Sequence, residues 1–426
     1  MIYMKKLSAI LIGHGMRGEA YAKYAVTHAD ELEIKAVAEP ELSRRKKAQD
    51  AYHIPDELAF ESWERLCDLP KMADFAIVAT QDKMHRDPAL KLIEKGYHLL
   101  LEKPMASTAK ECKEIAEAAE KKGVKVIVCH VLRFTKFWYT LKEVLDSGKI
   151  GVPLSVIHTE GVGHMHQSHS FVRGNWRNSV ESAPMILAKS CHDMDILQWL
   201  LGKKCQKVQS FGNRDHFNSE NRPEGASAYC AACPHADTCM YEPVRFYTRA
   251  KGNPWRDVVA NKVGATNEEI VEALRNGPYG RCVYDCDNDV VDHQTVNLQF
   301  EGGCTVVFTM TAFTNGRTIR IFGSKGEIDA DMENNIIKIH VFAANRDDST
   351  YETIQLDKVG QDIAAGHGGG DTGIMVDLIK YFNDEPASKS ICDIRTSYLN
   401  HLMAFAAEES RLTDTVIDLD AFSDSI

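Results

Sequence analysis

The segment Gly13-His14-Gly15-Met16-Arg17-Gly18 constrains the fold of this chain more than any other. It follows an apolar run at 7–12, typical of a buried parallel strand, and precedes a helical pattern at 19–29. The first glycine allows a tight turn, the second lets a ligand approach the backbone, and the third lets the helix pack closely on the strand. The segment therefore predicts a dinucleotide-binding turn. Its expected cofactor contacts are Gly13, Gly15, Met16, Arg17 and Gly18.

An acidic residue ends the next strand. Residues 33–38 are predicted as a second strand, and Glu39 follows it directly, about 20 residues beyond Gly18. A carboxylate there can accept hydrogen bonds from the adenosine ribose and repels a 2′-phosphate. Glu39 therefore favours NAD over NADP, a preference that the nearby Arg44 and Arg45 weaken.

Strands and helices continue to alternate through the first 130 residues. Strand patterns at 75–79, 98–101 and 124–129 are separated by helical patterns at 88–95 and 110–121. This alternation predicts a doubly wound parallel sheet, whose ligands bind beyond the carboxyl ends of the strands.

Polar residues stand at two of those strand ends. Thr80 and His85 follow one strand, and Glu102 and Lys103 follow the next, just before Pro104. All four are expected cofactor contacts. A lysine held near a nicotinamide and a hydroxyl can stabilise an alkoxide or relay a proton. The alternative is a surface lysine that precedes a proline turn.

Length and charge limit the classes of protein to which this chain can belong. A chain of 426 residues predicts two or three domains, and a net charge of −11 lacks the basic footprint of a nucleic-acid binder. No run approaches the roughly 20 apolar residues that span a bilayer. The short apolar run near the N-terminus ends in the glycine-rich turn, which favours a first strand over a signal peptide. We therefore expect a cytoplasmic protein.

Several motifs resemble those of the Gfo/Idh/MocA family, named after glucose-fructose oxidoreductase and inositol dehydrogenase. The matching residues are Gly13–Gly18, Ala79-Thr80 with His85, Glu102-Lys103-Pro104, Ser147-Gly148-Lys149-Ile150-Gly151 and Ser190-Cys191-His192-Asp193-Met194-Asp195. The resemblance implies an α/β protein with a Rossmann domain at 1–130. A second α/β domain at 131–426, with an open, mostly antiparallel sheet, would act in substrate binding and oligomerisation. A cysteine-rich insertion at about 213–285 lies outside the resemblance.

The same resemblance implies an activity. Family members usually oxidise or reduce a sugar or polyol carbon with a nicotinamide cofactor, using the lysine of the Glu-Lys-Pro turn and an Asp and a His four residues apart on one helix. Lys103 and His192 match these positions, but Ala188 stands where the aspartate is expected, with Lys189 beside it. The resemblance also implies a homodimer or homotetramer.

Residues 161–178 are rich in histidine, arginine and tryptophan, which is typical of a recognition loop. The expected cofactor contacts there are Trp176 and Arg177, and the expected substrate contacts are His166 and Arg173, together with Lys189 and His367 from elsewhere. A solvated loop and a metal site made of His164 and His166 are the alternatives. His367 belongs to a His-Gly-Gly segment that resembles one in family members acting as NAD-dependent glycosidases.

Four cysteines of the insertion suggest a metal site. Cys230, Cys233 and Cys239 follow the spacing C-x2-C-x5-C, and Cys282 is the expected fourth ligand because Cys286 lies in a polar run. Four thiolates fit tetrahedral, structural zinc, which would stabilise a segment with little apolar surface. An iron–sulfur cluster and free thiols are the alternatives.

Strand patterns at 154–159, 206–211, 290–300, 304–313, 317–323 and 335–343 predict the second sheet, the last four as consecutive antiparallel strands. Taken together, the sequence predicts an NAD-dependent oxidoreductase acting on a secondary hydroxyl of a sugar, glycoside or polyol. The alternatives are a redox-neutral glycosidase or lyase that recycles NAD in place, and a non-catalytic sugar-sensing regulator.

Overall fold

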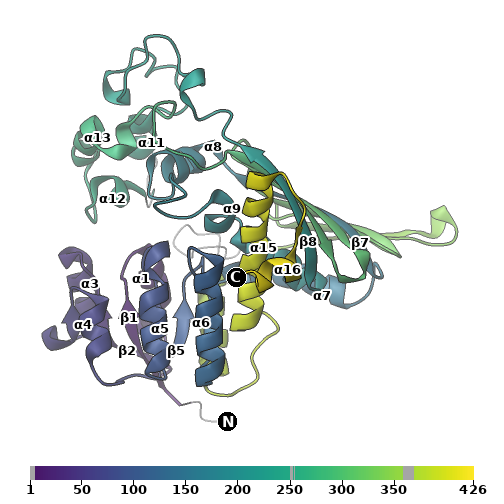
Figure 1. The fold of residues 1–426 in the computed structure, drawn as a ribbon, viewed down its shortest axis with the longest axis horizontal. Coiled ribbons are helices and arrows are strands. Elements are labelled where there is room, and N and C mark those ends of the chain that lie inside the picture. The colour runs from purple at the N-terminus through teal and green to yellow at the C-terminus, as the bar shows by residue number, and fades with distance from the viewer. Residues whose placement is uncertain (1–4, 250–252, 254, 358–368) are drawn as a thin grey trace.

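A computed structural model describes residues 5–249, 253, 255–357 and 369–426. Its first sheet has six parallel strands in the order β3-β2-β1-β4-β5-β6, which confirms the predicted Rossmann fold (Figure 1). The strands are β1 (Leu7–Ile12), β2 (Leu32–Ala38), β3 (Ala59–Phe60), β4 (Phe75–Val78), β5 (His98–Leu101) and β6 (Val126–Val128).

Helices cover both faces of this sheet, which explains why its strands are apolar without alternation. In β1, Leu11 enters one core and Ile12 enters the other. One face is covered by α1 (Met16–Ala22), α2 (Tyr24–Thr27), α3 (Leu42–Tyr52) and α14 (Gly370–Phe382), and the other by α4 (Trp63–Asp68), α5 (Arg86–Glu94) and α6 (Ala109–Lys122). The core of the first sheet is thus completed by α14, a helix from late in the chain.

The second sheet has nine strands in the order β14-β13-β12-β11-β7-β10-β9-β8-β15. The expectation of consecutive antiparallel neighbours is wrong at two places. β7 lies between β10 and β11 and pairs in parallel with β10, and β12 lies between β11 and β13. The strands β12, β14 and β15 were not predicted. The bounds are β7 (Pro153–Val162), β8 (Cys205–Asn213), β9 (His293–Phe300), β10 (Thr305–Thr311), β11 (Asn315–Gly323), β12 (Gly326–Asp331), β13 (Ile336–Val341), β14 (Thr350–Gln355) and β15 (Ile417–Asp418).

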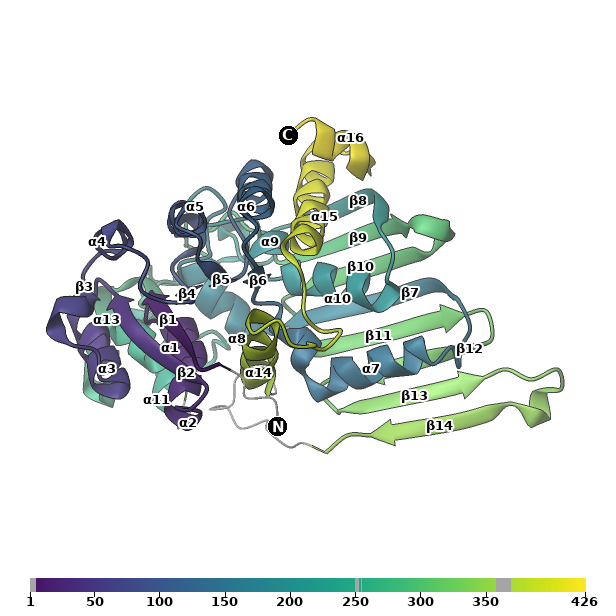
Figure 2. The ribbon, with the colours of Figure 1, turned by 90° about the horizontal axis from the view of Figure 1, so that it is seen from below.

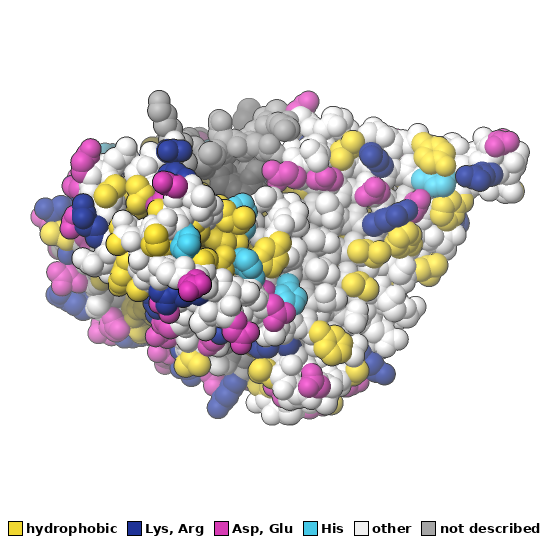
Figure 3. All heavy atoms as spheres, turned by 90° about the horizontal axis from the view of Figure 1, so that it is seen from above, with side chains coloured by type: hydrophobic (Ala, Val, Ile, Leu, Met, Phe, Trp, Pro, Cys, Tyr) yellow, Lys and Arg dark blue, Asp and Glu magenta, His cyan; other side chains and the backbone are white. Residues whose placement is uncertain are grey.

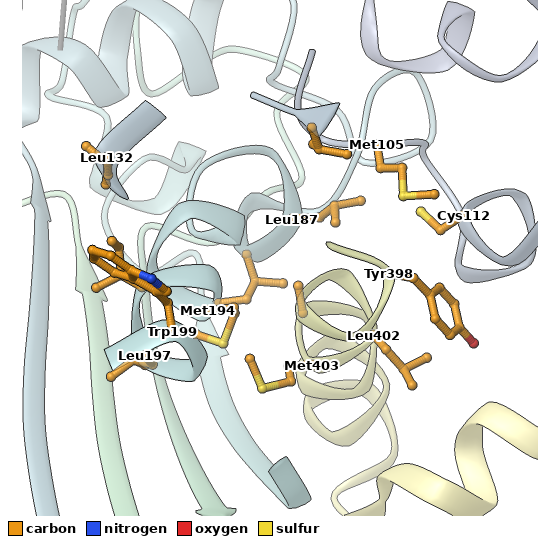
Figure 4. Close-up of a cluster of buried hydrophobic side chains, with 14 of the residues drawn as sticks. Met105, Cys112, Leu132, Leu187, Met194, Leu197, Trp199, Tyr398, Leu402 and Met403 are labelled. Carbon is orange, nitrogen blue, oxygen red and sulfur yellow. The ribbon is translucent and has the colours of Figure 1, made fainter. Parts of the chain in front are cut away.

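Helices lie on one face of the second sheet and join the two domains. These are α7 (Lys136–Asp146), α10 (Cys191–Leu201) and α15 (Ile394–Thr413), seen together in Figure 2. The helix α15 packs against β8, α10 and α6, and α16 (Leu419–Asp424) follows it. Figure 4 shows Tyr398, Leu402 and Met403 of α15 among side chains from both domains. One buried cluster therefore spans the two domains.

The opposite face of the second sheet is open. Ile157, Phe211 and Val307 are each at least 40% exposed there, and Figure 3 shows hydrophobic side chains scattered over this face among charged ones. The homodimer or homotetramer expected from the family stays a prediction, and this face offers apolar surface for it. No helix of the described residues is both long and apolar enough to span a membrane.

The insertion forms a small unit of its own above the carboxyl edge of the first sheet (Figure 1). It contains α11 (Pro243–Arg249), α12 (Trp255–Ala260) and α13 (Asn267–Asn276). Among the residues that the structure describes, its main core holds six buried ones, Tyr247, Val259, Ala265, Ile270, Leu274 and Tyr279. So small a core leaves the insertion dependent on additional contacts.

Replacing Ile374 in α14 by alanine tests whether this late helix completes the first domain. Ile374 is fully buried, so Ile374→Ala should lower the free energy of unfolding by about 2–5 kcal/mol in denaturant titration. Val376→Ala, at an exposed position of the same helix, should change it by less than about 0.5 kcal/mol. Equal effects of the two variants would contradict the assignment.

Candidate active site between the two domains

The glycine-rich turn has the geometry that a dinucleotide site needs. Gly13 has φ +89°, and a Cβ there would lie 2.5 Å from the Ala79 carbonyl oxygen. A Cβ on Gly18 would lie 2.0 Å from the Gly13 carbonyl oxygen, because α1 packs directly on the turn. A Cβ on Gly15 would meet nothing within 4 Å. Two of the glycines are thus required by the fold, whereas Gly15 borders the open space that a pyrophosphate would occupy.

The acidic residue at the end of β2 is buried and holds this turn. One carboxylate oxygen of Glu39 accepts a hydrogen bond from the His14 amide at 2.7 Å, and the other accepts one from the Glu41 amide at 3.0 Å. The Arg45 guanidinium donates to the Glu39 and Pro40 carbonyl oxygens, so it is turned inward. Of the two arginines that weaken the preference for NAD, Arg44 lines a cavity beside the glycine-rich turn, whereas Arg45 does not.

Glu102 lies at the centre of a buried network. It accepts hydrogen bonds from Arg17 Nε at 2.7 Å, from the Tyr21 hydroxyl at 2.6 Å and from the Lys103 amide at 2.6 Å. Burial alone would raise the pKa of Glu102, but the charges of Arg17 and Lys103 lower it below the ordinary value. Arg17 also pairs with Asp371 at 2.7 Å. Glu102 and Arg17 therefore hold the cofactor turn in place from below.

The Glu-Lys-Pro turn continues into a cis Lys103–Pro104 peptide bond. Lys103 Nζ donates to the carbonyl oxygen of Ala188 at 3.0 Å. The ring nitrogens of His85 lie 2.8 Å from the Pro104 carbonyl oxygen and 3.1 Å from that of Thr80. His85 thus lies behind the turn and positions it, and it is Thr80 that faces the cavity.

A cavity of about 220 Å³ lies between the two domains at the carboxyl edge of the first sheet. Its lining brings together residues from both domains that the sequence predicted as catalytic or binding. These are Arg17, Thr80, Glu102, Lys103, His166, Trp176, Lys189 and His192. His367 lies outside the described residues.

The floor of this cavity is a buried ion-pair network that the sequence did not reveal. Arg317 of β11 stands opposite Glu160 of β7 in the sheet register, with Nε 2.7 Å from a Glu160 oxygen. It also contacts Asp193 of α10 at 2.8 Å, and Lys189 Nζ lies 3.1 Å from the other Glu160 oxygen. Burial of Asp193 opposes ionisation, yet Arg317 and the hydrogen bond with His158 hold its pKa well below the ordinary value. The pairing fixes α10, and with it His192, on the sheet.

Residues 161–178 do not form a solvated loop. The segment 167–173 is a buried π-helix that follows a short helical turn, α8 (His164–His166). His166 faces the cavity, and burial together with the charge of Lys189 holds its pKa well below the ordinary value. The polarity of the segment suggested exposure, but its side chains are buried against the insertion.

Two predicted contacts from this segment point elsewhere. Arg173 donates to the carbonyl oxygens of Arg281 and Tyr241 inside the insertion and is not among the residues that line the catalytic cavity. Arg177 pairs with Asp287 and also lies outside that lining, so the expected roles of both arginines stay predictions that this arrangement does not support. Trp176 does line the cavity, and its indole donates to Asp82 at 2.9 Å.

The four predicted metal ligands line a second cavity, of about 270 Å³, within the insertion. A bridge between Tyr229 and Arg281 brings the two cysteine segments together, while Cys286 is absent from the lining. Two sulfurs on one zinc ion lie at most about 4.6 Å apart, twice the Zn–S distance. No three of these sulfurs lie within 4.8 Å of one another, so their positions do not support the expected zinc ion.

Within the described residues, one group does have three candidate ligand atoms within 4.8 Å of one another. Its members are His130, Asp195 and Cys392. Arg133 pairs with both Asp195 oxygens at 2.6 and 2.8 Å. An arginine in bidentate contact neutralises the carboxylate, so this group is a buried polar cluster rather than a metal centre.

Comparison with known proteins agrees with this geometry. Residues 7–130 match the family model described as "Oxidoreductase family, NAD-binding Rossmann fold", and residues 142–418 match its "C-terminal alpha/beta domain". The chain belongs to the Gfo/Idh/MocA family. It is therefore a member of an NAD-binding oxidoreductase family that includes sugar and polyol dehydrogenases.

Individual relatives are distant. The putative oxidoreductase YteT of Bacillus subtilis is 25% identical over 344 residues, 78% of each chain. Inositol 2-dehydrogenase of Salmonella typhimurium is 26% identical over 48% of this chain and 57% of its own length. The 2,7-anhydro-N-acetylneuraminate hydratase of Escherichia coli is 27% identical over 47% of this chain and 51% of its own. Family membership thus leaves the substrate open.

Among solved structures, levoglucosan dehydrogenase in complex with NADH and levoglucosan has a TM-score of 0.70. It covers 97% of this chain and 100% of its own, at 19% identity. An Agrobacterium radiobacter oxidoreductase, solved with NAD+, L-tartaric acid and magnesium, has a TM-score of 0.67 at 16% identity. It covers 98% of this chain and 100% of its own. These likenesses confirm the two-domain family fold.

Replacing Arg317 tests how much the buried ion-pair network contributes to the free energy of unfolding. Arg317→Met leaves Asp193 and Glu160 buried with less compensation, which should lower the free energy of unfolding by about 3–5 kcal/mol at neutral pH. The wild-type pairing stabilises above the unfolded Asp pKa of about 3.9, and this stability is lost as pH falls through the lower folded pKa of Asp193. The deficit of the variant in free energy of unfolding should therefore be full at neutral pH and narrow as the pH falls below about 4.

Denaturant titration at several pH values measures both effects. Arg320→Met is the matched control, because Arg320 lies on the same strand, is half exposed and pairs only with Glu327 at the surface. Its effect should stay below about 1 kcal/mol. A deficit for Arg317→Met that is equally small would refute the role of the network.

Proposed function

We propose that this protein is an NAD-dependent oxidoreductase that acts on a secondary hydroxyl of a sugar, glycoside or polyol. The observation that carries the proposal is the convergence of Lys103 and His192 on one cavity, at the edge where Gly15 leaves space for a dinucleotide. Named relatives that act on inositol and levoglucosan support the substrate class.

NAD, when bound, supplies a hydride acceptor at its nicotinamide ring. The protein's own groups then act on the substrate hydroxyl. Lys103 Nζ donates to the hydroxyl oxygen and stabilises negative charge there, while His192 accepts the hydroxyl proton as the C–H hydrogen leaves as hydride. The hydroxyl carbon becomes a carbonyl and NAD is reduced, so that protons and electrons balance.

The position of the missing aspartate has a structural counterpart. The last residue of α9 (Met185–Ala188) is Ala188, and its carbonyl oxygen accepts from Lys103. A backbone acceptor thus orients the lysine where family members have a carboxylate nearby. Lys189, which pairs with Glu160, lines the same cavity as His192, and we assign Lys189 and His166 to substrate binding.

A redox-neutral reaction is the second candidate. The relative named as a hydratase acts on an anhydro sugar, and a hydration involves no net oxidation. On this candidate, oxidation by NAD would acidify the C–H next to the new carbonyl, allow elimination of a neighbouring oxygen substituent, and be reversed by the same NADH. A non-catalytic sugar sensor is disfavoured because Lys103 and His192 both face the cavity.

Replacing the lysine tests the proposed chemistry. On a substrate identified from a panel of sugars, polyols and glycosides by nicotinamide absorbance and product analysis, Lys103→Met should lower kcat at least about 100-fold. NAD should still bind with a Kd within about threefold of wild type, because Glu102 and the glycine turn remain. Lys338→Met, on β13 of the second sheet, should behave like wild type.

Undiminished turnover of Lys103→Met would refute the assigned role. The oxidoreductase and the redox-neutral candidate share the first oxidation step, so they differ in whether NADH accumulates. Glycoside cleavage or water addition without net NADH would select the redox-neutral candidate. Absence of turnover across the panel, with a bound sugar, would select the sensor.

We also propose that Cys230, Cys233, Cys239 and Cys282 bind a metal through their thiolates. The support is that all four line one cavity in a unit with a small apolar core. Because the sulfurs stand wider apart than one zinc ion requires, zinc would have to draw them together, whereas an iron–sulfur cluster is larger.

Protein purified anaerobically without chelator should contain about one zinc per chain, or iron with acid-labile sulfide and visible absorbance. Cys233→Ser should lose the metal and lower Tm. Cys286→Ser should keep the metal, because Cys286 lies outside the cavity lining. Stoichiometric absence of both zinc and iron would exclude the site.

A further inference from the structure

The helix α12 of the insertion begins beside the catalytic cavity. Its first residue, Trp255, stacks on His169 with ring centroids 4.4 Å apart and planes at 12°. The Trp255 ring also lies 5.1 Å from that of His166, which lines the catalytic cavity. Tyr279 stacks on His169 at 4.8 Å. Aromatic stacking thus fixes this end of α12 to the wall of the active site.

The other end of α12 closes a separate cavity of about 190 Å³. One wall comes from the first domain, namely the glycine-rich turn at 14–16, Glu19, and Ser43, Arg44 and Lys47 at the start of α3. The opposite wall comes from the insertion, namely Asp257, Val258, Asn261, Lys262 and Val263. Figure 1 shows α12 standing over α1 and α3.

The first-domain wall identifies the ligand chemistry. His14 lines the cavity, and its amide is held by Glu39, the acid expected at the adenosine ribose. The turn that ends at Met16 presents the N-terminus of α1, which attracts phosphate. A dinucleotide lying along this edge would place its adenosine half in this cavity, on the far side of the turn from Lys103.

The insertion wall has groups suited to that half. Val258 and Val263 offer apolar contact for the face of a purine, and the Asn261 amide can donate to and accept from its edge. Lys262 adds positive charge near the phosphates, although it also pairs with Glu269. The insertion thus supplies apolar, amide and cationic groups opposite the turn that binds the pyrophosphate.

The segment is held in shape by its own side chains. Asp257 accepts hydrogen bonds from the amides of Gly264 and Ala265 at 3.0 and 3.3 Å, and Arg256 donates to the Ala265 carbonyl oxygen at 3.0 Å. The turn after α12 is therefore preformed, which reduces the entropy lost when a ligand binds.

We propose that residues 255–263, the clamp segment, bind the adenosine half of the dinucleotide and close it against the first domain. This inference deepens the proposed function and rests on it, because it assigns the insertion a part in holding the same cofactor. The stack of Trp255 on His169 connects the clamp segment to the active-site wall, so the insertion contacts both halves of the cleft.

A negative charge at the exposed Val263 tests the clamp segment. Val263→Glu should raise the Kd for NAD and for ADP-ribose about tenfold, because a carboxylate would replace the apolar contact with the purine and add a negative charge to a cavity that binds an anionic ligand. Binding of nicotinamide mononucleotide, which lacks adenosine, should not change. Val152→Glu, similarly exposed but next to β7 in the second sheet, is the matched control and should bind all three like wild type.

Hydrogen exchange on the wild-type protein gives a second readout that needs no variant. ADP-ribose should protect the amides of 257–265, whereas nicotinamide mononucleotide should not. Wild-type affinity of Val263→Glu for ADP-ribose, or an unprotected clamp segment in the ADP-ribose complex, would overturn the proposal. Failure of the wild-type protein to bind NAD at all would instead overturn the proposed function.

Discussion

The buried carboxylate of Glu102 holds together the parts of the active site that come from the first domain. It accepts hydrogen bonds from Arg17 in the cofactor turn, from Tyr21 in α1 and from the amide of Lys103. Arg17 extends the network to Asp371 at the start of α14. An ionised carboxylate this deeply buried is stable only with such partners, so the loss of any one would disturb the others.

The second domain contributes through a network of the same kind. Arg317 and Glu160 face each other across β11 and β7, and Asp193 connects that pair to α10. His192 precedes Asp193 directly, so the histidine is positioned by the pairing of its neighbour rather than by an aspartate one turn earlier. The site therefore retains a fixed histidine although Ala188 replaces the family's acid.

The sequence predicted the elements whose signals are local. The glycine turn, the acid after β2 and the Glu-Lys-Pro turn each depend on a few adjacent residues, and Lys103 and His192 then converge as expected. Glu160 and Arg317 were not predicted, because they are brought together only by the pairing of two strands that lie far apart in the sequence. Arg173 and Arg177 were expected to face a ligand because their segment is polar, whereas the structure packs that segment against an insertion whose fold no local pattern reveals.

The insertion contains both the helix α12 and the cavity lined by four cysteines. Its small core makes further contacts important for the position of α12. The aromatic stack of Trp255 on His169 is one such contact, and the proposed metal in the cysteine cavity would add a second. Because Arg173 contacts Cys230 from the same π-helix that carries His169, the cysteine cavity and the stack share one support. A metal that tightened this cavity would therefore also steady the wall that faces the adenosine half of the cofactor.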